Sequence, residues 1–264
     1  MAFMQVEFYS EVLALASTIQ VIAPERSSAG KEVPADGYPV LYLLHGGSDN
    51  HTSWHRFSSI ERYAADKRVI VVMPSVQYSF YTDQKLGFPY FTYLSEELPA
   101  VVGHLFHGSG RREDTFVAGL SMGGYGAFKL GINCPEKFAA VASLSGSLDQ
   151  RDRLGPTPSI NNEMMLRMAH YTFGSMEEYS GSRNDLAHVL EEHLRTGVRL
   201  PKFYQACGTL DHNYEINQSF YRQFGGRLDL TCETAEGRGH EWDYWDEQIR
   251  RVLEWLPVRG GDLS

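Results

Sequence analysis

Residues 114–128, which read DTFVAGLSMGGYGAF, constrain this chain more than any other stretch. Residues 115–119 are apolar and β-forming, and a small-residue helix pattern begins at Gly124. Between them lies a G-x-S-x-G motif centred on Ser121. This motif suits a serine on a tight turn between strand and helix, with its hydroxyl exposed at the carboxyl edge of a sheet. A phosphate-binding turn is the alternative, but the G-x-G-x-x-G spacing and the P-loop lysine are both absent.

Bulk properties limit the setting of this serine. A chain of 264 residues suits one α/β domain with a sizeable core. The net charge of −9 argues against nucleic acid and does not favour strongly anionic substrates. No run approaches the roughly 18 apolar residues of a membrane span, and residues 1–11 lack the pattern of a secretory signal. Three cysteines without C-x-x-C spacing indicate free thiols, so we expect a cytoplasmic protein.

Strand and helix patterns alternate along the chain. An antiparallel pair of strands is expected over residues 5–25, with a break near Glu11 and a turn at 27–38 after it. Further strands are expected over residues 39–44, 69–73, 115–119, 139–144, 201–207 and 228–234. Helices are expected over residues 54–66, 94–106, 124–133, 185–195, 213–225 and 242–256. The order predicts a mostly parallel central sheet with helices on both faces, in a single domain over residues 1–264.

Two segments fall outside this alternation. Residues 146–183 are rich in proline, glycine, methionine and polar residues, which suggests a small cap over the carboxyl edge of the sheet. Residues 75–91 form a long aromatic loop, expected to line a pocket wall; the alternative is an aromatic cluster packed beneath the loop.

Three reactive groups follow strands of the expected sheet. Ser121, Asp211 and His240 each come after a strand, in the chain order stated for α/β-hydrolases. A serine hydroxyl needs an imidazole to take its proton and a carboxylate to orient that imidazole. We therefore predict Ser121 as nucleophile, His240 as base and Asp211 as acid. The backbone N–H groups of Met122 and Gly47 are the candidate oxyanion donors.

Other residues could take these roles. His212 adjoins Asp211 and cannot easily reach Ser121 while that carboxylate orients it. Asp149 and Asp152 could supply the acid, although Asp211 lies at a cleaner strand-to-helix turn. Ser145 and Ser147 lack paired glycines and are better read as structural.

Metal and glycosidase chemistry have weaker signals. The pairs His51 and His55, and His104 and His107, lack the glutamate of H-E-x-x-H and an evident third ligand, so no metal site is predicted. The adjacent acids Glu96 and Glu97 are typical of a helix start and not of the carboxylate pair of a glycosidase.

The motifs together resemble the esterase D-like branch of the α/β-hydrolases. They are HGG at residues 45–47, Trp54, GLSMGGYGAF, GTLDH and GHEWDYWDE. The chain looks most like bacterial tributyrin esterases, relatives of feruloyl esterases, S-formylglutathione hydrolases and mycolyltransferases. The resemblance implies the roles given above for Ser121, Asp211, His240, Gly47 and Met122. It also implies short-chain acyl esters as small-molecule substrates, without a cofactor.

Substrate-binding residues are expected in and beside these motifs, at Gly46, Trp54, Tyr90 and Trp242. Formylglutathione hydrolases of the eukaryotic type carry a cysteine shortly after the oxyanion turn, where this chain has residues 48–50, SDN. Esters of acetyl or feruloyl groups on carbohydrate, acyl transfer to a sugar or glutathione, and a non-catalytic binding role stay as alternatives. The sequence leaves open whether the chain forms a homo-oligomer.

Overall fold

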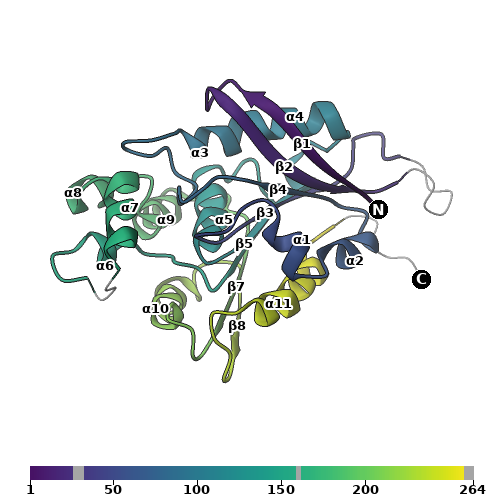
Figure 1. Cartoon of the computed structure of the whole chain (residues 1–264). Helices are drawn as coiled ribbons and strands as arrows, with labels where there is room; N and C mark the ends of the chain where they lie inside the picture. The colour runs from purple at the N-terminus through teal and green to yellow at the C-terminus, as the bar shows by residue number, and fades with distance from the viewer. Residues whose placement is uncertain (26–32, 159–161, 259–264) are drawn as a thin grey trace.

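The computed structural model describes residues 1–25, 33–158 and 162–258. An eight-stranded sheet runs through it in the order β1-β2-β4-β3-β5-β6-β7-β8 (Figure 1). The strands are β1 (Ala2–Ser10), β2 (Leu15–Ala23), β3 (Val40–Leu44), β4 (Ile70–Pro74), β5 (Thr115–Leu120), β6 (Ala140–Leu144), β7 (Lys202–Gly208) and β8 (Leu230–Ala235). Strand β2 pairs antiparallel with β1 and β4, and the remaining pairs are parallel. The chain therefore has the α/β-hydrolase architecture that its strand order predicts.

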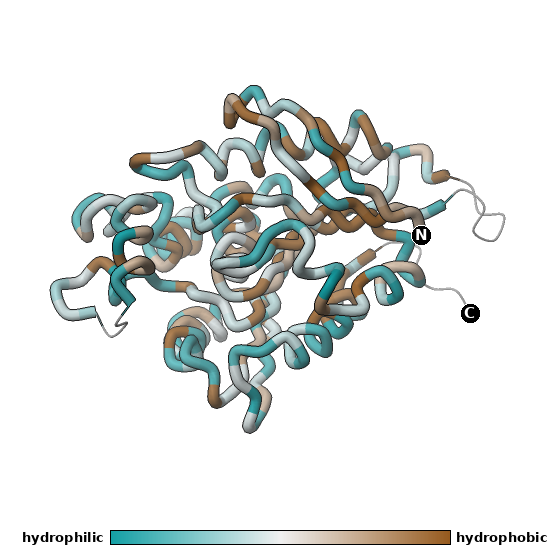
Figure 2. Tube along the Cα trace, in the orientation of Figure 1, coloured by the Kyte–Doolittle hydropathy of each residue, from teal (hydrophilic) through white to brown (hydrophobic). Residues whose placement is uncertain are grey.

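Helices cover both faces of this sheet. One core contains buried residues of α4 (Leu98–Phe106), α5 (Met122–Asn133), α9 (Leu186–Thr196) and α10 (Tyr214–Phe224). The other contains residues of α1 (Ser53–Phe57), α2 (Ile60–Ala65) and α11 (Trp242–Trp255). Residues along β3 alternate between the two cores, which explains why this strand reads as a continuous apolar run. Figure 2 shows this apolar character along the central strands.

Two expected helices differ in the structure. Residues 54–66 divide into α1 and α2, because Ser58 is extended and the Ser59 N–H donates to Asp246 of α11 at 2.7 Å. The helix expected over 94–106 begins earlier, with α3 (Tyr90–Thr92) and a π turn over Tyr93–Glu97 before α4. Pro99 cannot donate to the Ser95 carbonyl, which accepts from the Lys137 ammonium at 2.7 Å instead.

The segment 146–183 is more helical than its composition suggests. It contains α6 (Arg151–Leu154), α7 (Glu163–Phe173) and α8 (Met176–Tyr179). Phe173, at the end of α7, packs its ring against Phe80 and Tyr125, so the segment contacts the start of α5. Its role as a cap stays a prediction. Three parts of these predictions lie outside the described residues: 159–161 of this segment, 27–32 of the expected turn and 259–264 of the expected domain.

The aromatic loop 75–91 packs inward for the most part, which favours the alternative of an aromatic cluster beneath the loop. Phe80, Tyr81, Tyr90 and Phe91 are buried, whereas Tyr78 is half-buried. None of the described helices has the length and apolar character needed to cross a membrane.

Candidate active site

Ser121 lies on a strained turn between β5 and α5. Its backbone has φ 53° and ψ −114°, a conformation that is sparsely populated for a residue with a side chain. The glycines around it allow the close packing that this turn requires. A Cβ atom on Gly119 would lie 2.4 Å from the Gly123 carbonyl oxygen, and one on Gly123 would lie 2.4 Å from the Leu44 oxygen. The G-x-S-x-G spacing therefore follows from the contact between β5, α5 and β3.

Two backbone donors are available beside this serine. Met122 is the first residue of α5, so its N–H has no partner within the helix and lies at the positive end of the helix dipole. Gly46 is adjacent, since a Cβ atom there would lie 3.7 Å from the Ser121 Cβ. The N–H of the next residue, Gly47, has no backbone acceptor within the described part of the chain. Both N–H groups can therefore stabilise negative charge near Ser121.

His45 holds the turn that carries Gly46 and Gly47. Its imidazole is 1% exposed, and its Nε2 accepts from the Val76 N–H at 3.2 Å. The ring proton must therefore lie on Nδ1, which donates to the Gly46 carbonyl at 2.7 Å. The His45 carbonyl in turn accepts from the Tyr81 hydroxyl at 2.7 Å. Burial lowers the pKa of His45 to about 4, so the imidazole is neutral at pH 7.

Asp211 and His240 form a hydrogen-bonded pair at the ends of β7 and β8. His240 Nδ1 lies 2.9 Å from Asp211 Oδ2, and the Asn213 N–H donates to Asp211 Oδ1 at 2.8 Å. Burial acts to raise the pKa of Asp211, but the hydrogen bond and charge of His240 and the Asn213 N–H lower it below its usual value. The carboxylate is therefore ionised and fixes the proton of His240 on Nδ1, which leaves Nε2 free to accept a proton.

Strand β6 connects this pair to Ser121. The Ser121 N–H donates to the Leu144 carbonyl at 2.8 Å, and the Asn213 side chain donates to the Ser145 carbonyl at 2.9 Å. The ends of β5, β6 and β7 thus meet at one edge, as parallel pairing requires. No hydrogen bond joins the Ser121 hydroxyl to His240 in the part of the chain that the structure describes; such bonds often form only in the complex with substrate.

The alternative residues have other partners. The His212 ring lies tilted against the His240 ring, with centroids 4.2 Å apart, but its Nδ1 lies 3.9 Å from Asp211, beyond hydrogen-bond distance. Asp149 pairs with Arg151 at 3.0 Å. The Ser145 hydroxyl accepts from Trp245 Nε1 at 3.0 Å, and the Ser147 hydroxyl accepts from Arg153 at 2.8 Å. Among these residues, Asp211 and His240 have the geometry of an acid and base pair.

The predicted substrate-binding residues are distributed differently. Gly46 lies beside Ser121, as described above. Trp54 and Tyr90 are 1% and 2% exposed and offer no surface to a ligand, which corrects the substrate contact predicted for them. Trp54 Nε1 donates to the Leu44 carbonyl at 2.9 Å, so this residue holds the end of β3. Trp242 is half-buried, and its ring packs edge to face on Trp54.

Sequence reasoning missed two contributors near Ser121. The Tyr78 ring covers Gly47, since a Cβ atom on that glycine would lie 2.7 Å from Tyr78 Cε2. Arg153 of α6 bonds to Ser147, whose N–H donates to the Ser121 carbonyl at 3.1 Å. Tyr78 could have been singled out within the aromatic loop, but no motif marks Arg153.

Metal binding would compete with the acid and base pair. Asp211, His212 and His240 offer ligand atoms within 4.8 Å of one another, the one such group of three found among the described residues. The proton that His240 shares with Asp211 would have to leave before a cation could bind both side chains.

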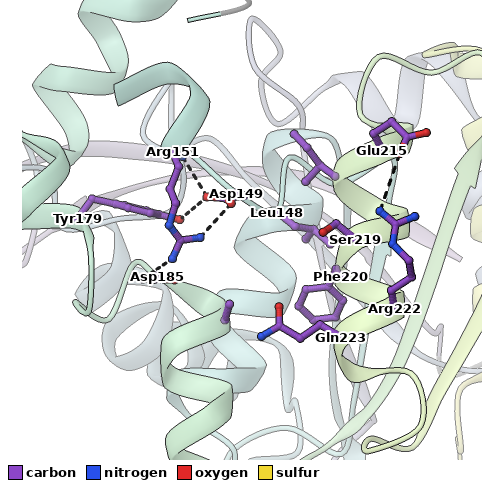
Figure 3. Close-up of a pocket in the computed structure, with 12 residues that line it drawn as sticks. Leu148, Asp149, Arg151, Tyr179, Asp185, Glu215, Ser219, Phe220, Arg222 and Gln223 are labelled. Carbon is purple, nitrogen blue, oxygen red and sulfur yellow. Dashed lines mark hydrogen bonds and ion pairs between the residues drawn. The ribbon is translucent and has the colours of Figure 1, made fainter. Parts of the chain in front are cut away.

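A cavity of about 350 Å³ lies between α9, α10 and the start of the segment 146–183 (Figure 3). Its apolar floor includes Leu148 and Phe220. Arg151 crosses one side, with its guanidinium held by Asp149 and Asp185. None of Ser121, Asp211 and His240 lines this cavity, so it is distinct from the strand ends described above.

Comparisons with known proteins agree with this architecture. Residues 10–256 match the family model described as "Putative esterase". An acetyl esterase of Caldicellulosiruptor saccharolyticus is 31% identical over 97% of this chain and 98% of its own. Two Staphylococcus aureus structures, each 28% identical over 97% of this chain and 98% of their own, superpose with TM-scores of 0.87 and 0.84. They are a fluorophosphonate-binding serine hydrolase and an S-formylglutathione hydrolase, respectively.

The family match over nearly the whole chain, together with the serine turn at a parallel sheet edge, identifies this chain as a member of the esterase family of α/β-hydrolases and as a serine esterase.

Proposed function

We propose that this protein is a carboxylesterase that hydrolyses short-chain acyl esters through an acyl-enzyme on Ser121. The observation that carries the proposal is the 2.9 Å hydrogen bond between His240 and Asp211, at the same sheet edge as the strained Ser121 turn. A base oriented by an ionised acid, at the same sheet edge as a partly exposed serine, is the arrangement that acyl transfer needs.

The reaction proceeds in two halves. His240 Nε2 takes the proton of Ser121 as the hydroxyl oxygen attacks the ester carbonyl, and the N–H groups of Met122 and Gly47 bind the resulting oxyanion. His240 then gives the proton to the leaving alcohol, and the acyl group stays on Ser121. Water, deprotonated by His240, releases the acid in the second half.

Short acyl groups are favoured by the comparison and by the packing around the serine. The relative from Caldicellulosiruptor saccharolyticus is described as an acetyl esterase. The Tyr78 ring lies against Gly47 and restricts the space near the oxyanion donors. S-formylglutathione hydrolysis is the second candidate, supported by the likeness to the hydrolase of that name.

Labelling and substitution test the proposal. A fluorophosphonate probe should attach to Ser121 and to no other serine, as peptide mass spectrometry would show. Ser121→Ala should abolish turnover of p-nitrophenyl acetate while its thermal unfolding matches wild type; Ser147→Ala is the matched control and should keep most activity. A folded Ser121→Ala protein with wild-type turnover would end the proposal. Esters from acetyl to octanoyl, with S-formylglutathione and acetylated sugars, would then define the substrate.

We also propose a cytoplasmic location and a capping role for residues 146–183. The cysteines Cys134, Cys207 and Cys232 are all free thiols, which fits a reducing compartment. Deletion of α7 would test the capping role. If the segment covers the active site, the deletion should change the order of kcat/KM values among esters of different acyl length.

A further inference from the structure

Helix α6 carries two arginines with opposite surroundings. Arg151 faces the cavity of Figure 3 and contacts two carboxylates, Asp149 at 3.0 Å and Asp185 at 2.6 Å. Arg153 is 7% exposed, and its Nη1 donates only to uncharged oxygens, Ser147 Oγ at 2.8 Å and Gln150 Oε1 at 2.9 Å. No carboxylate of the described residues forms an ion pair with Arg153. Its charge is therefore buried without direct contact to a counter-charge, and Asp149 and Asp152 act on it only from beyond ion-pair distance.

This arrangement lowers the stability of the folded protein unless a ligand pairs with the charge. Burial lowers the pKa of Arg153, yet a guanidinium stays protonated in proteins. The Nε donor of Arg153 is also buried and has no hydrogen-bond partner among the residues that the structure describes. A buried cation with an unused donor is destabilising by itself, and a planar guanidinium is the group best suited to a carboxylate.

Contacts connect Arg153 to the turn that carries Ser121. Ser147, its hydrogen-bond partner, donates its N–H to the Ser121 carbonyl at 3.1 Å. The guanidinium lies 5.6 Å from the Phe80 ring centroid. Phe80 in turn meets the edge of Tyr78, the residue that covers Gly47.

The base side of the site is also within its electrostatic reach. Burial and the charge of His240 lower the pKa of His212, and the charge of Arg153 adds to this effect. Burial raises the pKa of Tyr78, and the charge of Arg153 opposes that rise. Arg153 therefore acts electrostatically on Tyr78, which covers the oxyanion turn, and on His212, whose ring contacts His240.

We propose that Arg153 binds a carboxylate carried by the substrate, so that the enzyme prefers esters with an anionic group close to the scissile bond. The inference rests on the proposed esterase function and adds a substrate class to it. The net charge of −9 gives no long-range attraction for such a substrate, so the preference depends on this local contact. The carboxylate can belong to the acyl group or to the alcohol.

Matched substrate pairs test this directly and separate the two sources. Monoethyl succinate and ethyl succinamate differ on the acyl side by a carboxylate in place of an amide of similar shape. The pair 3-acetoxybenzoate and 3-acetoxybenzamide differs in the same way on the alcohol side. We expect kcat/KM for the anionic member of one pair to exceed that of the neutral member about tenfold or more, the effect of one charge-assisted hydrogen bond. Equal values in both pairs would overturn the proposal without any variant.

Substitutions then assign the preference to the residue. Arg153→Gln should bring the kcat/KM ratio of the preferred pair close to one, because its neutral amide has no charge to pair with the carboxylate. Arg153→Lys should keep part of the ratio, since it keeps the charge and loses the planar fork. Arg151→Gln is the matched control in the same helix and should keep the ratio in full. A folded Arg153→Gln protein with the wild-type ratio would refute the assignment.

Binding provides a readout that is independent of turnover. Calorimetry on the Ser121→Ala protein should show tighter binding of the anionic ester than of its amide partner, and equal binding would count against Arg153. Failure of the esterase proposal can be distinguished from failure of the Arg153 proposal, because only the former appears as continued hydrolysis of neutral esters by Ser121→Ala.

Discussion

The buried imidazole of His45 should make the stability of this protein depend on pH. The folded protein keeps His45 neutral, because Nε2 accepts from Val76 and protonation would place two donors face to face. Burial lowers the pKa of His45 from 6.5 to about 4, and only the hydrogen bond to Gly46 opposes this. The unfolded chain therefore binds the proton at a higher pH than the folded chain does. Stability from His45 is present in full above pH 6.5 and is lost as the pH falls toward 4.

The size of this effect follows from the two pKa values. At pH 5.0 the unfolded imidazole is almost fully protonated, whereas the folded one is almost fully neutral. Integrating the difference in bound protons from pH 7.5 to pH 5.0 gives about 2 kcal/mol of lost stability. Protonation of the folded imidazole itself, near pH 4, would break the hydrogen bond that Nε2 accepts from the Val76 N–H.

Urea unfolding at pH 7.5 and pH 5.0 measures the effect. Other groups titrate in this window, so the quantity to compare is the difference in unfolding free energy between wild type and His45→Gln. The glutamine variant should be less stable at pH 7.5, and the gap should narrow by about 2 kcal/mol at pH 5.0. His104→Gln is the control, since His104 is exposed; its gap should not change. A gap for His45→Gln that is equal at both pH values would refute the reasoning.

Three further substitutions test separate parts of the structure. Asp211→Asn should lower kcat by about 10⁴-fold, because an amide favours the wrong tautomer of His240; steady-state kinetics with an unchanged kcat would contradict its role. Gly123→Ala should lower Tm strongly, since its Cβ would lie 2.4 Å from a backbone oxygen. Gly226→Ala should leave Tm nearly unchanged, since its Cβ would meet no atom of the described chain within 4 Å. Trp54→Phe removes a donor to the carbonyl that ends β3 and should cost about 1–3 kcal/mol in urea unfolding; no loss would contradict its structural role.

The sheet was predictable from the sequence because parallel strands are buried on both faces. Strands β3, β5 and β6 are buried throughout and appear in the sequence as unbroken apolar runs. Reactive residues that follow such strands must meet at one edge, so chain order was sufficient to pair His240 with Asp211 before any distance was known. The fold and the esterase family are confirmed by the comparisons.

Features set by contacts between distant segments were not predictable in this way. The break between α1 and α2 depends on Asp246, far along the chain, which takes the Ser59 N–H. The burial of Trp54 depends on Trp242, whose ring packs against it. Arg153 carries no local signal, because its surroundings depend on Ser147 and Gln150, whose uncharged oxygens accept its hydrogen bonds in the folded chain. A sequence pattern indicates that a residue will be buried or hydrogen-bonded, but seldom which remote residue will be its partner.

The sheet order also has a consequence for how activity is acquired during folding. Strand β5 pairs with β3 and β6, and β6 with β7, across long intervening segments, so each pairing must overcome a large loss of chain entropy. Local helices can form well before these strands meet. Ser121, Asp211 and His240 come together only after the last of the strands has docked. Recovery of esterase activity should therefore lag behind recovery of helical signal during refolding, which makes enzymatic turnover a reporter of the final step of assembly.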